Sequence, residues 1–340
     1  MPLISAALIA ALVLISGCTS KQGPQKELFR KSANIMYTTV AVTVSAEFHE
    51  EADDAIEAAF DEIRELERLL SFWTDDSDIA AINKNAGKEA VMVFEPTMEV
   101  ISKALEISKM TDGAFDATVG PVIRQWDFKE EKLPEPGALK EALEKVDYRE
   151  IILDVVNSTA YLSRPEMSFD TGGIAKGFAA DRAIAKLKAL GIEAALVSVS
   201  GDIKAYGTKP DGTVWRVGIR DPRSEDPNEF IASVDLNDEA ISTSGDYERF
   251  FIKDGKRYHH ILDPKTGYPA YGSMSVSVIA GSATLTDGLS TGIFVLGPQK
   301  GLAVLEAGGI KGVIISSEGR TFVTKGFGDS IRWKNPTYKP

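Results

Sequence analysis

The stretch HHILDPKTGYP, residues 259–269, sets two adjacent histidines against a turn with little conformational freedom. An Asp-Pro pair opens the turn and a glycine closes it, which is typical of a rigid loop. The chain has only three histidines, and one held against this loop would have a fixed ring orientation. Successive side chains of a strand alternate between its two faces, so alternation by itself predicts one ring in the core and one in solvent.

A second stretch, SFDTGGIAKGFAADRAI at 168–184, predicts the end of a strand, a glycine turn and the start of a helix. Adjacent glycines let the backbone approach a ligand closely, and the free N–H groups of a helix start suit phosphate oxygens. Lys176 falls in the first helical turn, where the helix dipole disfavours a cation, so an anionic partner is indicated. The dinucleotide-binding and P-loop patterns are absent. Taken alone, the turn is equally well interpreted as a plain helix entry.

A third stretch, LTDGLSTGIFVLG at 285–297, predicts a helix with Asp287 and Thr291 four residues apart on one face. A carboxylate and a hydroxyl are hard oxygen ligands that suit Mg²⁺. The alternative is that Asp287 only complements the positive end of the helix. The sequence has no Cys/His cluster, which disfavours zinc, iron and copper chemistry.

Composition narrows the class of protein. The 340 residues are 44% hydrophobic and 26% charged, which is ordinary for a globular protein. The net charge of −12 argues against a nucleic-acid binder, which needs a basic surface. For the same reason, a polyanionic ligand would need a metal ion or local hydrogen-bond donors.

The sequence of the N-terminus indicates a targeting segment rather than a part of the folded domain. An apolar run ends in Ile-Ser-Gly-Cys at residues 15–18, which resembles a bacterial lipoprotein signal. The run of about 15 residues is short for a membrane span of roughly 20. We therefore expect residues 1–17 to be a signal peptide, Cys18 to be lipidated, residues 18–32 to be a tether and residues 33–340 to form one domain. Cys18 is the only cysteine, so the chain has no intrachain disulfide.

Hydrophobic periodicity predicts the elements of that domain. Apolar residues at helical spacing predict a helix over 51–70, and alternation of β-branched residues predicts a strand over 35–48. Strands and helices follow one another without a regular βαβ repeat, so the expected fold class is α+β: a single domain with a largely antiparallel sheet and packed helices. The other expected elements are helices at 96–111, 134–146, 173–189, 284–296 and 298–307, strands at 150–155, 160–163 and 274–280, short strands within 194–252, and a terminal hairpin with its tip at 318–319.

The chain resembles the ApbE family, the FAD:protein FMN transferases of bacterial envelopes. The resemblance covers nearly all of the sequence after about residue 33, and the H-x-x-D-P-x-T-G pattern is its most specific part. It implies an ApbE-like fold. The segments that carry it, in the order and spacing of the family, are GAFDATVGP (113–121), DTGGIAKG (170–177), SGDI (200–203), STSGDYERFF (242–251), HHILDPKTGYP (259–269) and TDGLSTGIFVLG (286–297).

The resemblance implies an enzyme that binds FAD and Mg²⁺, moves FMN onto a Ser or Thr hydroxyl of a target protein and releases AMP. The implied metal ligands are Asp287, Thr291 and a backbone carbonyl at Gly173, and the implied catalytic residues are His260 and Asp287. The positions that match residues lining FAD are Met36, Trp73, Ala114, Phe115, Asp116, Asp170, Lys176, His260, Ile261, Thr266 and Gly267.

General chemistry agrees with these roles. Cleaving a pyrophosphate depends mainly on positioning and charge neutralisation, which Mg²⁺ assists. The attacking hydroxyl must lose its proton. His260 is expected beside the pyrophosphate as the acceptor, with a carboxylate as the alternative, whereas His259 is expected to face solvent.

Two other functions stay open: an Mg²⁺-dependent FAD pyrophosphatase that gives FMN and AMP, and a non-catalytic flavin-binding lipoprotein. The latter would not need Asp287, Thr291 and His260 together. The expected partners are FAD, target proteins with a Ser/Thr acceptor motif such as membrane redox-pump subunits, and a membrane through lipidated Cys18, but no nucleic acid. The expected location is the cell envelope, anchored and facing the periplasm or the exterior.

Overall fold

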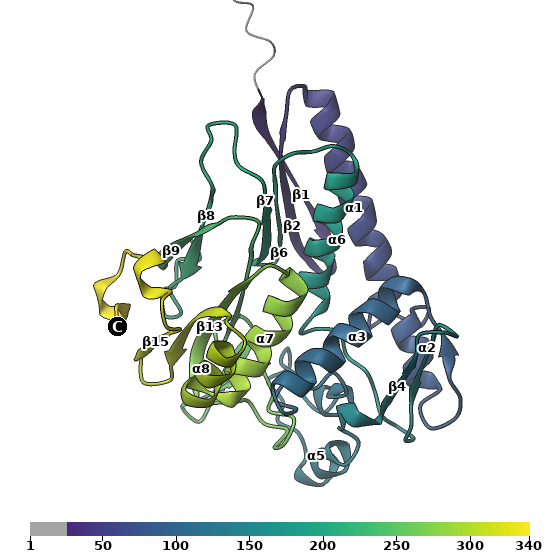
Figure 1. Ribbon diagram of the computed structural model, residues 1–340. Coiled ribbons are helices and arrows are strands. Elements are labelled where there is room, and N and C mark those ends of the chain that lie inside the picture. The colour runs from purple at the N-terminus through teal and green to yellow at the C-terminus, as the bar shows by residue number, and fades with distance from the viewer. Residues whose placement is uncertain (1–25) are drawn as a thin grey trace, which may run out of the picture.

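An eight-stranded sheet runs through residues 26–340, the part of the chain that the computed structural model describes (Figure 1). The segment predicted as a signal peptide, and Cys18, lie outside these residues. Neighbouring strands of the sheet are antiparallel throughout. In spatial order its strands are β1 (Glu27–Ile35), β2 (Thr38–Ala46), β6 (Ala195–Val199), β7 (Asp202–Tyr206), β10 (Ala240–Gly245), β13 (Ser273–Ala280), β14 (Lys311–Ser316) and β15 (Thr321–Val323).

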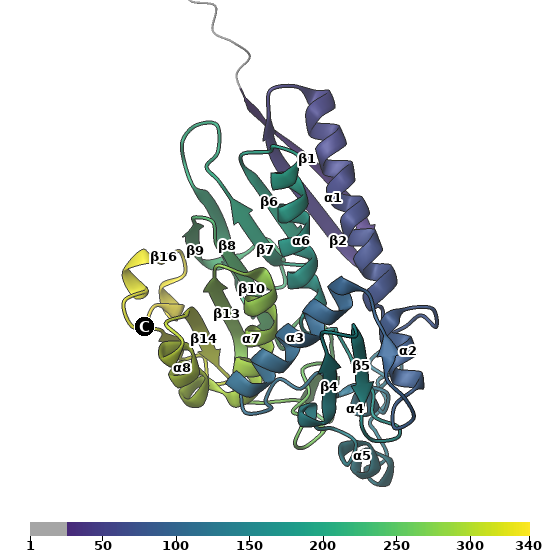
Figure 2. The same ribbon diagram turned by 45° about the vertical axis from the view of Figure 1, so that its right-hand side comes forward.

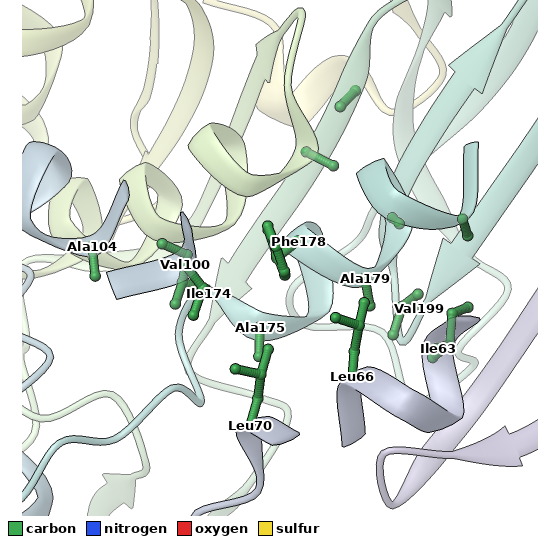
Figure 3. Close-up of a cluster of buried hydrophobic side chains, with 14 of the residues drawn as sticks. Ile63, Leu66, Leu70, Val100, Ala104, Ile174, Ala175, Phe178, Ala179 and Val199 are labelled. Atoms are coloured by element: carbon green, nitrogen blue, oxygen red, sulfur yellow. The ribbon is translucent and has the colours of Figure 1, made fainter. Parts of the chain in front are cut away.

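Helices cover one face of this sheet, as Figures 1 and 2 show. They are α1 (His49–Leu70), α6 (Ala175–Ala189), α7 (Ala283–Leu296) and α8 (Pro298–Ala307). The predicted apolar face of α1 is buried, including Ile56, Phe60 and Ile63. Figure 3 shows Leu66 and Leu70 of α1 directed at Ala179 and Ala175 of α6.

The opposite face of the sheet is covered by a second, three-stranded sheet in the order β16-β9-β8. Its strands are β8 (Trp215–Arg220), β9 (Phe230–Leu236) and β16 (Arg332–Trp333). Strand β14 shows how alternation fills both layers: Ile314 belongs to the helix-side core, while Val313 and Ile315 pack with Trp215 on the other side. Both faces are buried, which is why the central strands are so apolar.

A smaller lobe lies beside the helix layer (Figure 2). It contains α2 (Asp78–Lys84), α3 (Glu95–Met110), α4 (Gly120–Ile123), α5 (Pro136–Leu143) and a sheet of β3 (Val91–Met92), β5 (Thr159–Leu162) and β4 (Ile151–Asp154). The hairpin of β11 (Phe250–Lys253) and β12 (Lys256–His259) packs Phe251 into a third core with Trp126, Leu139 and Leu262. Short 3-10 turns occur at Tyr148–Glu150, Gly328–Ser330 and Pro336–Tyr338.

The fold class is confirmed as mixed helix and antiparallel sheet, and the expected helices are present with ends shifted by no more than a turn. Residues 27–32 were expected to belong to a tether, but residues 27–35 form β1 and pair along their whole length with β2. The chain reverses at Met36 and Tyr37, whose φ angles are 54° and 56°. Left-handed residues at both central positions suit a tight hairpin, so the single strand expected over 35–48 is instead the end of one strand and all of the next. Helix α2 and strand β3 were not predicted.

Candidate active site

The glycine turn at residues 170–174 leads into α6 and contacts the end of α1. Asp170 Oδ1 accepts a hydrogen bond from Gly172 N at 2.7 Å. Thr171 Oγ1 donates to Leu70 O at 2.9 Å, which ties the turn to the last residue of α1. These contacts hold the turn in one conformation at the edge of the sheet.

Gly173 is closely surrounded by side chains from two other segments. A Cβ there would lie 3.1 Å from Phe115 Cε2 and 3.4 Å from Thr291 Oγ1. The structure thus brings together three residues that the sequence placed on separate segments: Gly173 before α6, Phe115 after α3 and Thr291 on α7.

Helix α7 is anchored where it begins. Ser282 caps it by accepting a hydrogen bond from Leu285 N at 3.3 Å. Asp181 of α6 accepts from Ser282 Oγ at 2.7 Å and from the backbone N atoms of Ala283 and Thr284 at 2.9 and 2.8 Å. A carboxylate at a helix N-terminus satisfies free N–H groups and the helix dipole together, so α7 cannot slide freely along α6.

Asp287 faces α6 from the second turn of α7 and is 3% exposed. Its Oδ2 accepts a hydrogen bond from Gly177 N at 2.9 Å, and its Oδ1 lies 3.5 Å from Lys176 Nζ. Burial, together with the nearby carboxylate of Asp202, raises the pKa of Asp287 to about 7 in the metal-free protein. The alternative role, complementing the helix dipole in the first turn, belongs to Asp181 instead.

Lys176 has an anionic partner within the protein, namely Asp202 at the start of β7, which its Nζ contacts directly. Burial alone would lower the pKa of Lys176, but the carboxylates of Asp202 and Asp287 outweigh burial and raise it. Sequence reasoning did not predict a role for Asp202. Two signals pointed to it: Asp202 lies in the segment SGDI (200–203) that carries the family resemblance, and it directly follows the tight Ser-Gly turn between β6 and β7, where Ser200 and Gly201 have φ angles of 53° and 91°.

The donor set fits a divalent cation. Two buried carboxylates, Asp202 and Asp287, face one ammonium group, that of Lys176. Uncompensated buried charge is costly, and the raised pKa of Asp287 reflects this deficit. The Asp287 carboxylate, the Thr291 hydroxyl and the Gly173 carbonyl are hard oxygen donors of the kind that Mg²⁺ prefers. Over residues 26–340 no three His, Cys, Asp or Glu side chains group as a metal cluster, so a cation here would also need ligands from water or phosphate.

The segment 114–116 is buried beneath the glycine turn. Ala114 is 4% exposed and Phe115 is 5% exposed. The Asp116 carboxylate accepts hydrogen bonds from Thr118 N and Oγ1 at 2.8 and 2.6 Å and from Tyr148 N at 2.9 Å. Asp116 therefore organises the loop, while Phe115 contacts the site.

Met36 and Trp73 lie on two loops at the same end of the sheet. The hairpin containing Met36 adjoins the β6–β7 turn, because Ser200 N donates to Thr39 O at 3.2 Å. Trp73 follows the end of α1 and is 68% exposed, with its ring edge-on to Phe72 at 4.9 Å. Both positions leave side-chain surface open to a flat ring.

The two histidines do lie on opposite sides of the strand, but the expected solvent exposure of His259 is wrong. His259 is 2% exposed, with its ring edge-on to Tyr271 and Phe294. Its Nε2 lies 2.8 Å from Ala270 O, and its Nδ1 accepts from Ile261 N at 3.3 Å. Burial lowers the pKa of His259 to about 4. Both ring nitrogens are occupied, so His259 is a core residue.

His260 is half-buried, and within residues 26–340 its Nε2 makes no hydrogen bond. Its backbone N donates to Arg249 O at 3.0 Å, and its Nδ1 lies 3.3 Å from the same oxygen. A carbonyl oxygen can only accept, so Nδ1 carries the proton and Nε2 keeps its lone pair. Partial burial, with the charge of Arg249, lowers the pKa of His260 below its usual value, so the ring is neutral at pH 7.

Asp170 lies in the same charged environment. Burial raises the pKa of Asp170, and the N–H of Gly172 and the charges of Arg249 and Arg124 oppose that rise. The cationic groups next to the glycine turn are therefore contributed by two other segments, the loop after α4 and the loop before β11. Neither arginine was predicted from the sequence.

The rigid loop after the histidines is built as expected but packs on the smaller lobe. Gly267 has φ 72°, and its N donates to Asp263 O at 2.8 Å. Its carbonyl accepts from Trp126 Nε1 at 2.9 Å. Thr266 is exposed at the loop surface, whereas Ile261 is 5% exposed in the helix-side core. Of these predicted FAD contacts, only Thr266 presents its side chain to solvent.

Known proteins resemble this chain over most of its length. The sequence model of the ApbE family matches residues 36–314. An FAD:protein FMN transferase of Treponema pallidum is 37% identical over 299 residues, which cover 83% of this chain and 82% of that protein. The crystal structure of the ApbE protein of Thermotoga maritima superposes with a TM-score of 0.82 at 33% identity, covering 89% of this chain and 99% of that one. The flavinyl transferase ApbE of Pseudomonas stutzeri, in its apo form, gives a TM-score of 0.80 at 31% identity, covering 90% and 97%.

Proposed function

The chain belongs to the ApbE family and is an FAD:protein FMN transferase, and we propose that it uses Mg²⁺ to move FMN from FAD onto a Ser or Thr hydroxyl, releasing AMP. One observation carries the metal requirement: the two buried carboxylates of Asp202 and Asp287 against the single ammonium of Lys176. A site with that imbalance is suited to a cation, which would in turn bind the oxygens of a pyrophosphate.

Different groups of the protein would bind the cation and the phosphates. Asp287, Thr291 and the Gly173 carbonyl would hold Mg²⁺, which when bound neutralises phosphoryl oxygens and stabilises the leaving phosphate. The N–H groups of Ile174 and Ala175 already donate to Thr171 O and that of Gly177 donates to Asp287 Oδ2, so phosphate oxygens would rely on the cation and on Lys176 rather than on these N–H groups. Lys176 then remains as a fixed positive charge held in place by Asp202.

The transfer step breaks one P–O bond and forms another. The acceptor oxygen attacks the FMN phosphorus, the bond to the AMP phosphate breaks, and AMP leaves with the electron pair. The hydroxyl proton goes to a base, and we assign it to Nε2 of His260, whose other nitrogen already carries a proton toward Arg249 O. Asp287 is the alternative acceptor only when it does not bind metal.

Water in place of the acceptor hydroxyl would make the same site an FAD pyrophosphatase, and the two activities differ only in what reaches the phosphorus. A flavin-binding protein without turnover would have no use for the buried charge imbalance beside the glycine turn. The chemistry therefore favours catalysis over storage.

We further propose that the enzyme is anchored in the cell envelope through lipidated Cys18, outside the described residues, and modifies membrane redox-pump subunits. The support is the signal-like sequence before Cys18 and its position as the only cysteine. No helix among residues 26–340 is long and apolar enough to span a membrane.

The test combines the enzyme with FAD, Mg²⁺ and candidate acceptor proteins, and measures flavin fluorescence in a denaturing gel. We expect covalent flavin on the acceptor, lost in EDTA and in Asp287→Ala. The control is Asp329→Ala, which removes an exposed carboxylate that belongs to none of the segments of the site, and it should match the wild type. Full activity of Asp287→Ala in EDTA would refute the metal assignment.

A further inference from the structure

Three hydroxyl groups form a continuous chain between strand β10 and helix α7, which pack side by side (Figure 2). Ser244 Oγ lies 2.8 Å from Ser290 Oγ and 3.3 Å from Thr291 Oγ1. Ser290 Oγ donates in turn to Asp287 O at 2.9 Å. The chain thus begins at one proposed metal ligand and ends on the backbone of another.

The direction of each hydrogen bond in this hydroxyl chain follows from the acceptor at its end, Asp287 O. Asp287 O is a carbonyl and can only accept, so the single proton of Ser290 is directed to it. Ser290 must then accept from Ser244, whose own single proton is thereby used. Thr291 is left as the donor in its contact with Ser244. Its hydroxyl proton points toward Ser244, and its lone pairs are free on the other side.

We infer that Ser244 and Ser290 are positioning residues that turn the Thr291 hydroxyl so that its oxygen can bind the cation. This inference rests on the proposed function, in which Thr291 is a ligand. A cation on Oγ1 would draw electron density from the hydroxyl and make it a stronger donor, which would strengthen the long 3.3 Å contact to Ser244. Neighbours that orient metal ligands typically contribute about 10–100-fold to metal affinity or activity.

The interface between β10 and α7 contains a second pair of hydrogen-bonded hydroxyl groups, which does not contact the proposed metal ligands. Ser242 Oγ lies 2.8 Å from Thr286 Oγ1, which donates to Ala283 O at 3.1 Å. Ser242 precedes Ser244 by two residues on β10, and its partner Thr286 precedes Ser290 by four residues on α7. Ser242 therefore has the same chemistry and a hydrogen bond of equal length, although it is fully buried whereas Ser244 is half-buried. It has no contact with a proposed ligand, which makes Ser242→Ala a suitable control.

The experiment measures Mn²⁺ binding directly, by electron paramagnetic resonance, with ADP present as a pyrophosphate that cannot donate FMN. The proteins are the wild type, Ser244→Ala, Ser290→Ala, Ser242→Ala and Asp287→Ala, and thermal unfolding is measured for each. We expect Ser244→Ala and Ser290→Ala to weaken Mn²⁺ binding about 10–100-fold. Ser242→Ala should leave the affinity unchanged while lowering the melting temperature about as much as the other serine variants do.

Each outcome bears on the inference. Unchanged Mn²⁺ affinity in Ser244→Ala, with binding abolished in Asp287→Ala, would overturn the hydroxyl chain and leave the proposed function standing. Equal weakening in Ser242→Ala would mean that loosening of α7, rather than orientation of Thr291, sets the affinity, and would also overturn it. Absence of Mn²⁺ binding in the wild type would overturn the metal site and the inference with it.

Discussion

Replacing Gly177 with alanine tests whether the close approach of α6 and α7 builds the site. Gly177 lies where the two helices meet, and its N–H donates to Asp287 Oδ2 at 2.9 Å. A Cβ there would lie 2.6 Å from the carbonyl carbon of Ala283 and 2.7 Å from Asp287 Cβ, and closer still to the Ala283 oxygen. None of these atoms is the end of a flexible side chain, so the helices themselves must move.

The size of the effect follows from these distances. Relaxed carbon contacts are about 3.5 Å, so the helices must separate by roughly 1 Å. The Gly177–Asp287 hydrogen bond would then stretch to about 4 Å, beyond bonding distance. Overpacking costs about 1–3 kcal/mol, losing a hydrogen bond to a charged group about 1.5–3 kcal/mol, and alanine regains about 1 kcal/mol of helix propensity. We expect a net destabilisation of about 1.5–5 kcal/mol.

The assay is urea unfolding followed by tryptophan fluorescence, together with Mn²⁺ affinity. Gly137→Ala in α5 is the matched control, because a Cβ at Gly137 would meet nothing within 4 Å. That variant should be unchanged or stabilised by up to about 1 kcal/mol. A Gly177→Ala protein that is as stable as the wild type and binds Mn²⁺ equally well would refute the reasoning.

Three further predictions concern single residues. His259→Ala should destabilise the protein by about 2–4 kcal/mol through a buried cavity, as measured by urea unfolding. Burial lowers the pKa of His259 to about 4, so between pH 6.5 and 4 the unfolded chain takes up a proton that the folded protein does not. The free energy of unfolding should therefore fall as the pH drops through this window, and it should fall less in His259→Ala. An equal fall in both proteins would count against the assignment. His260→Ala should keep FAD affinity and fold but lose about 10²–10⁴ in single-turnover FMN transfer, and unimpaired transfer would exclude His260 as the base. Cys18→Ser should move the protein from the membrane fraction to the soluble fraction or leave an unprocessed precursor, and normal processing and membrane retention would exclude the lipid anchor.

Local sequence patterns predicted an element correctly where the residues that determine it are neighbours in the sequence. The helix at 51–70 was predicted because its buried residues repeat at helical spacing, and the structure buries that face. Strand β1 was not predicted because it is an edge strand: most of its inward positions are only half-buried, and one of them is Lys31, which hides the hydrophobic alternation. Its pairing with β2 depends on a hairpin at Met36 and Tyr37, neither of which is a usual turn residue.

The two histidines show what the alternation of side chains along a strand can and cannot predict. It correctly predicts that His259 and His260 lie on opposite sides of the strand. It does not say which side is covered, because Tyr271 and Phe294, which enclose His259, come from later segments of the chain. The expected exposure was therefore assigned to the wrong residue.

The sequence by itself determined the chemistry that the protein contains: a glycine turn before a helix, a carboxylate and a hydroxyl one turn apart, and a histidine beside a rigid loop. These depend on residue type and short spacing, which are written directly in the chain. Only the tertiary structure decided the charge balance of the site, because Asp202 meets Lys176 and Asp287 across three separate elements. It also decided the orientation of Thr291, since the contact from β10 through Ser244 crosses 47 positions of the sequence. Burial and electrostatic coupling arise from atoms that pack together in space, and no local pattern records them.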